Sequence, residues 1–422
     1  MKLLDFQSEF EKVLDRKYFS AKIHPLREKA FNAFLDIGLP NRKWEDWRFT
    51  QFKNISQKFY KISEKKHSKI TTFNFAEHNI SDVDTITFYN GHYKEEFSDS
   101  IPEIQLLNGL EYLEHYNWKY DYPSDCPFEL LNTAFMDSGL NIIIKKGQSI
   151  KRPIRFLIIS SGQDELMVSP KIHIDIENNS SATFIEHHVG NSSDFLINTS
   201  IQIKLLENSI LDHIRIQSNS SKTTNISNIK VDQSEDSHYN FFQLAFGSDL
   251  SRLNLDARLN GKGAECSLNG LSLSNKTQQL GSHIITNHYS PNCNSSQNFK
   301  NILQDKSSAI FNGKTVVHKD AQKTDSRQSN KSLLLSENAL MNSNPQLEIY
   351  ADDVKCSHGS TTGALDDDAL FYLRSRGLNF LNAQNLLIRG FASELFDLIK
   401  HDPTRTFILG KFNNWLNKNV KL

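Results

Sequence analysis

The sequence lacks most of the short motifs that identify a chemical activity. Its 422 residues include only four cysteines, which are widely separated and form no CxxC pair. Four isolated cysteines in a chain of this length make neither a disulfide framework nor a self-contained zinc or iron–sulfur site. A phosphate-binding loop, a dinucleotide-binding glycine motif, an HExxH zinc motif and a nucleophile elbow are also absent. Any metal chemistry must therefore use isolated ligands that folding or a partner brings together.

The chain also lacks an excess of charge and long apolar runs. Its 48 basic and 49 acidic residues nearly balance, so nothing predicts binding to nucleic acid or to an anionic membrane surface. No window holds the ~18 consecutive apolar residues that a membrane helix needs. The first residues lack the apolar core of a signal peptide. We therefore predict a cytoplasmic protein without a membrane or nucleic-acid partner.

Helical periodicity marks the start of the chain. A first apolar stripe has the spacing of one helix face: Phe6, Phe10, Val13 and Leu14. Pro25 and Gly38 suit the first turn and the C′ position of a second helix. The aromatic-rich segment 44–50 is too dense for a linker, which predicts that it anchors the N-terminal region. We predict an N-terminal helical or mixed domain over residues 1–125.

From about residue 140 to residue 350 the apolar period changes to two. The alternating apolar residues fall into short groups: Ile172, Ile174 and Ile176; Ile201, Ile203 and Leu205; Leu211, Ile214 and Ile216; Ile226, Ile229 and Val231; Leu253, Leu255 and Leu259. Turn-forming residues separate these groups, as at 177–180 and 260–263. The pattern predicts roughly 200 residues of short strands with no helix between them.

Such a run of strands is compatible with a sandwich pair, a propeller, a barrel or a β-solenoid. No repeat of ~40 residues supports a propeller. The strands are nearly regular without being copies of one another, and Asn and Ser crowd the turns. These features suit an irregular parallel β-helix, although composition alone leaves a sandwich open.

Helical periodicity returns after Ser360. The acidic run 366–368 lies where a helix N-terminus favours carboxylates, and Gly377 is placed to close that helix. We interpret this run as a helix start and not as a metal site, because no further acceptors follow at calcium-loop spacing. We predict a β-helix core over residues 126–362 and a C-terminal helical domain over residues 363–422.

Three of the histidines in the strand region are considered as metal ligands. His187 and His188 are adjacent, and adjacent residues of a regular strand point to opposite faces. The two therefore cannot bind one ion together. We interpret them and His173 as solvated histidines or as core histidines with hydrogen-bond partners.

Cys356 and His358 form the most interesting pair. They are two residues apart, so in a strand both side chains emerge on one face. A thiolate and an imidazole can share a soft transition metal such as iron or zinc. Two ligands are too few for a closed site, so others must come from Cys266, Cys293 or His288, or from a partner chain. From the residues alone, a buried cysteine beside a hydrogen-bonded histidine is the commoner arrangement.

A nearly continuous pattern surrounds this pair over roughly residues 310–400. Its main segments are Gly313-Lys314, Ala321-Gln322-Lys323-Thr324, Leu333-Leu334-Leu335-Ser336, Pro345-Gln346-Leu347-Glu348-Ile349, Lys355-Cys356-Ser357-His358-Gly359-Ser360-Thr361-Thr362-Gly363 and Phe371-Tyr372-Leu373-Arg374-Ser375-Arg376-Gly377. The pattern resembles the signature of the SufB/SufD family, the scaffold proteins of SUF iron–sulfur cluster assembly. Near the N-terminus, Gly38-Leu39-Pro40 and 45–50 resemble a motif of the SufD branch. The Cys-Ser-His-Gly order is also the SufD form, whereas the SufB branch carries a Glu-His-Glu pattern there.

The resemblance implies a mainly β protein with α-helices: a right-handed parallel β-helix, or irregular solenoid, flanked by helical N- and C-terminal domains. It implies a complex with a SufB-like paralogue, paired through the β-helix ends, and with two copies of a SufC-like ABC ATPase held by the C-terminal helices. A transient iron–sulfur cluster is then built at the SufB interface, where a SufB cysteine faces His358 as a metal ligand with Cys356 beside it. No cofactor is expected to bind tightly to the isolated chain, which is not expected to be an enzyme.

Two other functions remain open at this point. A β-helix carbohydrate-active enzyme would need carboxylates or basic residues clustered in one exposed groove, which the sequence cannot locate. A homodimer of this chain acting as a structural adaptor would need neither the paralogue nor the ATPase. Co-purification with SufB-like and SufC-like chains separates these alternatives.

Overall fold

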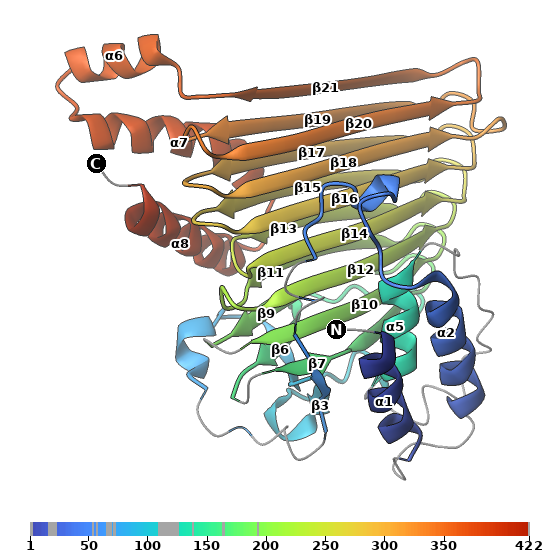
Figure 1. Ribbon diagram of the computed structural model, residues 1–422. Coiled ribbons are helices and arrows are strands. Elements are labelled where there is room, and N and C mark those ends of the chain that lie inside the picture. The colour runs from blue at the N-terminus through green and yellow to red at the C-terminus, as the bar shows by residue number, and fades with distance from the viewer. Residues whose placement is uncertain are drawn as a thin grey trace.

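A computed structural model gives the structure of the chain and describes residues 3–15, 23–52, 55, 58–64, 70, 73–108, 126–136, 139–162, 165–191 and 194–420. The chain forms a parallel β-solenoid of about eight turns with helices at both ends (Figure 1). The mainly β fold class predicted from the sequence is confirmed, and the sandwich is excluded. No described helix has the length and apolarity needed to cross a membrane.

Two sheets make up the solenoid. The strands of sheet A are β1 (Lys61–Ile62), β4 (Gln105–Asn108), β5 (Gly139–Ile144), β7 (Leu166–Val168), β8 (Lys171–Ile176), β10 (Phe195–Leu205), β12 (Thr224–Gln233), β14 (Leu250–Leu259), β16 (Gln279–His288), β18 (Ser308–Val317) and β20 (Leu340–Ile349). The strands of sheet B are β2 (Asp84–Tyr89), β3 (His92–Lys94), β6 (Ile154–Ser160), β9 (Ser181–Gly190), β11 (Ile210–Ser218), β13 (His238–Ala245), β15 (Glu265–Ser274), β17 (Asn294–Leu303), β19 (Asp325–Leu334) and β21 (Lys355–Gly363). From β8 onward consecutive strands alternate between the sheets, so each turn adds one parallel strand to each of them.

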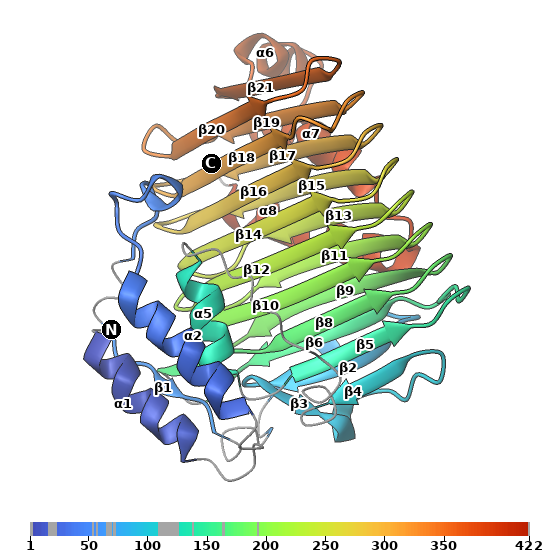
Figure 2. The same ribbon diagram turned by 90° about the vertical axis from the view of Figure 1, so that its right-hand side faces the viewer.

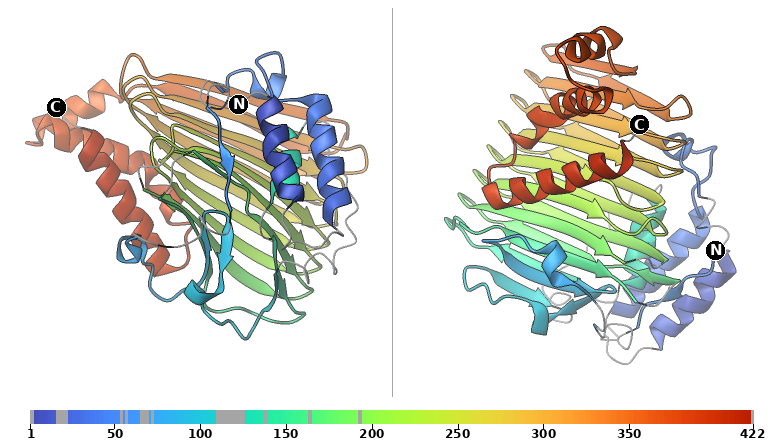
Figure 3. Two further views of the ribbon diagram at one scale, coloured as in Figure 1. Left: turned by 60° about the horizontal axis from the view of Figure 1, so that its bottom comes forward. Right: turned by 90° about the vertical axis from the view of Figure 1, so that its left-hand side faces the viewer.

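The helices flank these sheets. The α-helices are α1 (Leu3–Leu14), α2 (His24–Ile37), α5 (Pro127–Phe135), α6 (Asp367–Ser375), α7 (Phe380–Phe396) and α8 (Asp402–Asn419). The short 3-10 helices are η2 (Glu45–Trp47), η4 (Phe75–His78) and η5 (Glu95–Phe97). Figure 2 shows α2 and α5 on the side of sheet A, and the right panel of Figure 3 shows α7 and α8 lying across the outer face of sheet B.

The turns that lead into sheet B share one backbone device. The turns before β9, β11, β13, β15, β17 and β19 each place a residue in the left-handed region, where Asn, Asp and Gly are favoured: Asn179 (φ 57°), Asn208 (φ 55°), Asp236 (φ 51°), Gly263 (φ 70°), Asn292 (φ 59°) and Lys323 (φ 60°). Backbone hydrogen bonds connect successive turns, for example from the Asn208 N–H to the Glu235 carbonyl at 3.0 Å. The turn residues recognised in the sequence therefore mark the corner that stacks one rung on the next.

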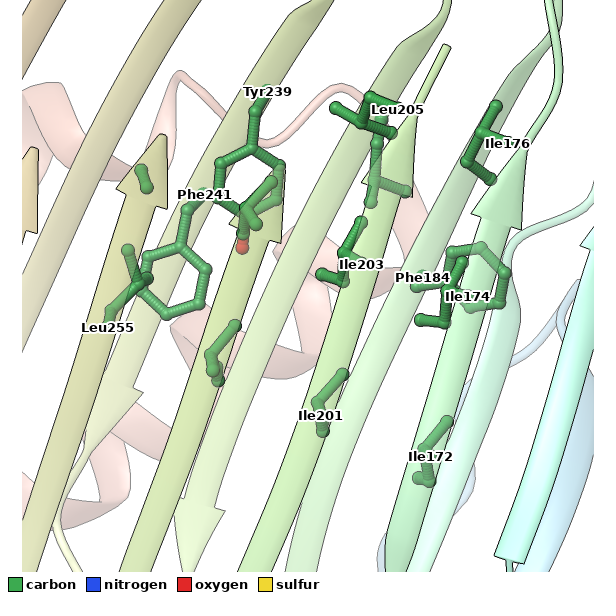
Figure 4. Close-up of a cluster of buried hydrophobic side chains, with 14 of the residues drawn as sticks. Ile172, Ile174, Ile176, Phe184, Ile201, Ile203, Leu205, Tyr239, Phe241 and Leu255 are labelled. Atoms are coloured by element: carbon green, nitrogen blue, oxygen red, sulfur yellow. The ribbon is translucent and has the colours of Figure 1, made fainter. Parts of the chain in front are cut away.

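Inside the solenoid, aliphatic side chains stack in register. Ile172 lies opposite Ile201, which lies opposite Ile229, and the ladder continues through Leu255 and Ile284. All five are buried. Figure 4 shows part of this core, with the isoleucines of β8 and β10 side by side. Burial of these side chains, at roughly 1.5–3 kcal/mol each, makes the period-two alternation of the sequence specify the inner face.

The N-terminal helices cover part of the outer face of sheet A. Phe6 and Phe10 of α1 pack with residues of α2 and α5, as the stripe in the sequence predicts. The second helix contains Pro25 in its first turn and ends at Gly38, whose N–H donates to the Phe34 carbonyl at 2.7 Å. Trp47 is buried beneath the Arg252 guanidinium, 3.6 Å from the ring centroid. The predicted anchoring role of the aromatic segment 44–50 is therefore confirmed.

At the other end, α7 and α8 cover the outer face of sheet B. Ile388 and Leu395 of α7 and Phe412 of α8 form one buried cluster with outward-facing residues of β9, β11, β13 and β15. The Asp366 carboxylate caps α6 by accepting from the N–H groups of Asp368 and Ala369, at 2.9 and 3.2 Å. The interpretation of the acidic run as a helix start is confirmed.

Candidate functional site

The solenoid ends at an uncovered turn made of β20 and β21. Both strands pair with a neighbour on one side only, with β18 and β19 respectively. Residues along β20 and β21 are exposed or half-buried, whereas most residues of β18 are buried and buried residues alternate with more exposed ones along most of β19. The inner face of this last turn is therefore accessible, and nothing within the described residues closes it (Figure 1).

Cys356 and His358 lie on this open inner face. On β21 they stand opposite Ser326 and Gln328 of β19, both of which are buried inside the solenoid. Because parallel neighbours in register point the same way, both candidate ligands face along the solenoid interior. Cys356 is half-buried and His358 is exposed. The structure places the pair on one face, as their spacing predicts.

Polar side chains line the interior directly beneath the pair. The His288 Nε2 lies 2.8 Å from the Ser295 hydroxyl, which donates to the Ser326 hydroxyl at 2.9 Å. The Gln328 amide donates to the Thr315 hydroxyl at 2.9 Å. The aliphatic core of the earlier turns thus gives way to a hydrogen-bonded core at the open end. A polar interior tolerates an accessible end better than an aliphatic one, because water can solvate it.

The thiol of Cys356 lies in a mixed environment. The side chain packs beside a small apolar cluster of Val317, Ala321 and Ala351. Burial raises the pKa of the Cys356 thiol above its ordinary value; a hydrogen bond from the Ser326 backbone opposes the rise, and the Asp325 carboxylate adds to it. In the chain by itself Cys356 therefore stays a thiol at neutral pH, and a metal ion or a partner's charge must favour the thiolate.

The three further ligands considered from the sequence do not join the pair. Cys266 belongs to the same inward column as Cys356 but lies three strands away, a distance of ~14 Å at normal strand spacing. Cys293 is buried in the turn before β17, where its thiol donates to the Gly261 carbonyl at 3.2 Å. His288 ends β16 in the opposite sheet, and burial together with nearby His318 lowers its pKa to about 4.

No group of three or more His, Cys, Asp or Glu side chains that could hold a metal ion occurs among the described residues. Cys356 and His358 are therefore two ligand groups without a third from the described part of the chain. A tetrahedral iron or zinc site needs four ligands. What the chain presents at its open end is half of a coordination shell.

The other histidines have structural surroundings. His187 and His188 point to opposite faces of β9, as expected, and both are fully buried. His188 faces inward and hydrogen-bonds Glu186, so the core interpretation with a partner applies to it. His187 faces α8 and contacts His78 and Phe407 edge-on, with ring centroids 5.7 and 5.3 Å apart.

Sequence reasoning missed a buried ionic cluster in the middle of the solenoid. Glu186 accepts from the Arg215 Nε at 3.2 Å and lies 3.4 Å from the His213 Nε2, and all three side chains are at most 1% exposed. Burial alone would raise the pKa of Glu186, but Arg215 and then His188 hold it well below its usual range. A signal existed in the sequence: charged residues at 186 and 215 occupy inward positions of their strands.

Exposed apolar side chains gather at the same end of the molecule. On β20 and just after it, Leu340 is 55% exposed, Ile349 42% and Tyr350 62%. On α6, Phe371 is 74% exposed and Tyr372 56%. Clustered exposed apolar residues on a soluble protein mark surfaces that bind other macromolecules.

Known proteins match nearly the full length of the chain. The family model for the N-terminal region of SufBD proteins matches residues 1–156, and that for the SufBD core domain of SUF iron–sulfur cluster assembly matches residues 157–391. The chain is 29% identical to the iron–sulfur cluster assembly protein SufD of Escherichia coli, over 94% of this chain and 93% of that protein. It is 30% identical to an iron–sulfur cluster assembly SufBD family protein of Synechocystis, over 88% of this chain and 86% of that protein.

The first of these family models covers the helical N-terminal region and the second covers most of the solenoid with its open end. The resemblance read from the residues around Cys356 and His358 is thus confirmed over nearly the full length. The chain belongs to the SufBD family of iron–sulfur cluster assembly proteins.

Proposed function

We propose that this chain is the SufD-type subunit of a cytoplasmic scaffold on which iron–sulfur clusters are assembled. The observation that carries the proposal is the open terminal turn, where Cys356 and His358 offer two ligands on an accessible inner face. A SufB-like paralogue docks on this turn and supplies the remaining ligands. The nascent cluster is cargo shared between the two subunits, and neither holds it permanently.

The backbone of the terminal strands supports such docking. An edge strand presents unpaired N–H and C=O groups, which natural proteins cover or protect. β20 is ten residues long and β21 is nine, and β20 carries exposed apolar residues, so the two strands are poorly protected as free edges. A related solenoid end could pair with them and continue both sheets, burying Ile349 and Tyr350 at the interface.

In this proposal the chain has no catalytic cycle of its own. It contains no phosphate-binding loop, so ATP hydrolysis belongs to a SufC-like ABC ATPase bound through the C-terminal helices. The exposed aromatic residues of α6 suit that contact. His358 acts on the cargo as an iron ligand or as a proton-transfer group, with the Cys356 thiol beside it.

Co-expression with SufB-like and SufC-like chains tests the assembly. We expect the three chains to co-purify, and Ile349→Glu to reduce recovery of the SufB-like chain because it places a charge at the docking edge. Ile210→Glu is a matched control, since Ile210 is 40% exposed on β11 far from the open end. Equal recovery with both variants contradicts docking at the terminal turn.

Co-purification and an activity assay separate the other two functions. A chain that forms only homodimers, and recovers neither the paralogue nor the ATPase, would be a structural adaptor. Cleavage of a polysaccharide by the purified chain would instead support a β-helix carbohydrate-active enzyme. Both outcomes overturn the scaffold assignment.

A further inference from the structure

The open end of the solenoid also holds a pair of hydroxyl groups, beside the two candidate ligands. Ser343 lies on β20 and Ser360 on β21, and the Ser360 hydroxyl donates to the Ser343 hydroxyl at 2.8 Å. Ser343 stands opposite Phe311 of the buried core, so its side chain faces the interior. Ser343 is half-buried and Ser360 is exposed. The bond therefore joins the two sheets across the accessible last turn (Figure 1).

Asn330 of β19 fixes the orientation of the Ser343 hydroxyl from below. Asn330 is fully buried, and its Oδ1 accepts from the Asn301 amide at 2.9 Å. Its Nδ2 is therefore the atom that approaches Ser343, and it donates to the Ser343 oxygen at 2.8 Å. Asn301 is held in turn, because its amide also donates to the Ser332 hydroxyl at 3.2 Å. This buried chain makes Ser343 an acceptor of the hydrogen bond from β19.

The hydroxyl pair retains one proton for which the described residues provide no acceptor. A hydroxyl oxygen accepts two hydrogen bonds and donates one. Ser343 accepts from both Asn330 and Ser360, so its own proton needs a further acceptor. Its neighbour on β18 is Phe311, whose side chain has no acceptor atom, which leaves the open end as the direction for this bond. If the roles within the pair are exchanged, the spare proton belongs to Ser360, which faces the same open end.

This donor lies next to the candidate ligands. Ser360 follows His358 by two residues on β21, so the two side chains share a face and lie about 6.6 Å apart along the strand. Cys356 lies the same distance from His358 in the other direction. A metal–nitrogen bond and a metal–sulfur bond of ~2 Å each, followed by a hydrogen bond of ~3 Å, span nearly the same length. The hydroxyl pair is therefore within reach of a sulfide bound to an iron that His358 holds.

We propose that the Ser343–Ser360 pair donates a hydrogen bond to a bridging sulfide of the nascent cluster beside His358. This inference rests on the proposed function, because it assigns a second contact to the same cargo. Sulfide is an anionic acceptor, and hydrogen bonds to the sulfurs of a cluster help to set its reduction potential. The donor stabilises the reduced cluster, which carries the more negative charge, and it orients the cargo on the face of β21.

The reduction potential of the cluster in the purified three-chain complex tests this contact. The double variant Ser343→Ala with Ser360→Ala removes both hydroxyl groups, and we expect it to retain the complex and its cluster. At a fixed potential its ratio of reduced to oxidised cluster should fall about tenfold, which for a one-electron couple is a shift of ~59 mV to a more negative potential. Ser343→Thr, which keeps a hydroxyl group at this position, should retain the potential of the unaltered complex.

Two single variants control for other effects of the double variant. Ser360→Ala leaves Ser343 with its proton and with the bond from Asn330, so its potential should change less than that of the double variant. Asn344→Ala is the matched control on β20, since Asn344 follows Ser343 and points to the outer face. A double variant whose potential equals that of the Asn344→Ala complex would overturn the inference.

Resonance Raman spectra of the same complexes provide an independent readout. Exchange into D2O replaces the hydroxyl proton by a deuteron, so iron–sulfide stretching bands of the unaltered complex should shift. The shift should be smaller in the double variant, an effect that a purely structural role of the two serines would not produce. Equal deuterium shifts in the two complexes would contradict the contact and leave the scaffold assignment standing. A complex without a cluster in every variant, including the unaltered chain, would overturn the proposed function and this inference together.

Discussion

At the scale of single residues, the inner face of the solenoid mixes an aliphatic ladder with fully buried ionic groups. Glu186 and Arg215 face each other on β9 and β11, and Gln243 and Ser227 satisfy further donors of the guanidinium at 2.7 and 2.8 Å. Burial of an ion pair is costly unless its hydrogen bonds are complete. The near-complete bonding of Arg215 explains how a charged pair is tolerated inside the core.

Removing one charge of this pair should be strongly destabilising. We expect Glu186→Gln to lower the free energy of unfolding by roughly 3–5 kcal/mol, since it leaves the Arg215 charge buried and uncompensated. The double variant Glu186→Leu with Arg215→Met should lose less than the sum of its single variants. Urea unfolding measures both quantities. A single-variant loss below about 1 kcal/mol would show that the pair is not a coupled buried unit.

At the scale of elements, α8 closes over sheet B through a stack of rings. His187 on β9 lies between His78 of η4 and Phe407 of α8. Burial, and then nearby Lys411 and Arg155, lowers the pKa of His78 to about 4, while burial followed by His78, Arg155 and Lys411 holds the pKa of His187 well below its ordinary value. Both rings are therefore neutral in the folded protein at neutral pH.

Because the His187 ring is buried in its neutral form, the free energy of unfolding should decrease as the pH falls. The folded-state pKa of His187 is below the unfolded value of 6.5, so the unfolded chain binds more protons as the pH falls below 6.5. Protonation of His187 in the unfolded chain should by itself lower the free energy of unfolding by about 2 kcal/mol between pH 7 and pH 5. The variant His187→Phe, which keeps a ring there, should show a smaller decrease in urea midpoint over this range. An unchanged decrease would mean that protonation of His187 does not oppose folding.

Several elements could be predicted from the sequence because residues within the element itself determine them. Pro25 and Gly38 predicted where α2 begins and ends. The alternating isoleucines of β8 and β10 predicted which side chains face the solenoid interior. α5 was not anticipated, because its nine residues are almost entirely buried and show no polar face. The strands β2 and β4 lie in the region predicted only as helical or mixed, because their pairing partners β6 and β5 lie further along the chain.

For the site, the strand spacing predicted the common face of Cys356 and His358 but not its accessibility. Whether that face is interior or solvent-exposed depends on where the solenoid stops, which is a property of the whole stack. The distances from Cys356 to Cys266, Cys293 and His288 likewise follow from the order of the rungs. Alternation within one strand contains no information about that order.

At the scale of the whole molecule, the solenoid has two different ends. The first turns are closed by the antiparallel strands β3 and β4 and lie near the N-terminal helices, whereas the last turn stays open beside α6 (Figures 1 and 3). The aliphatic core lies in the closed part, and the polar core and the candidate ligands lie at the open end. The two ends therefore differ in the way that a scaffold requires: one part is a closed, stable body, and the other is an open surface that a partner can cover.

The central claim is that His358 completes a cluster-building site only together with a partner. The most direct test is the iron and acid-labile sulfide content of the purified three-chain complex after cluster assembly, compared between His358→Ala and Ser357→Ala. Ser357 is exposed on the opposite face of the same strand and controls for changes in β21 itself. We predict that His358→Ala leaves the amount and size of the complex unchanged but lowers cluster content at least several-fold, while Ser357→Ala retains it. Cluster content equal to that of the unaltered complex in the His358→Ala variant would contradict the account.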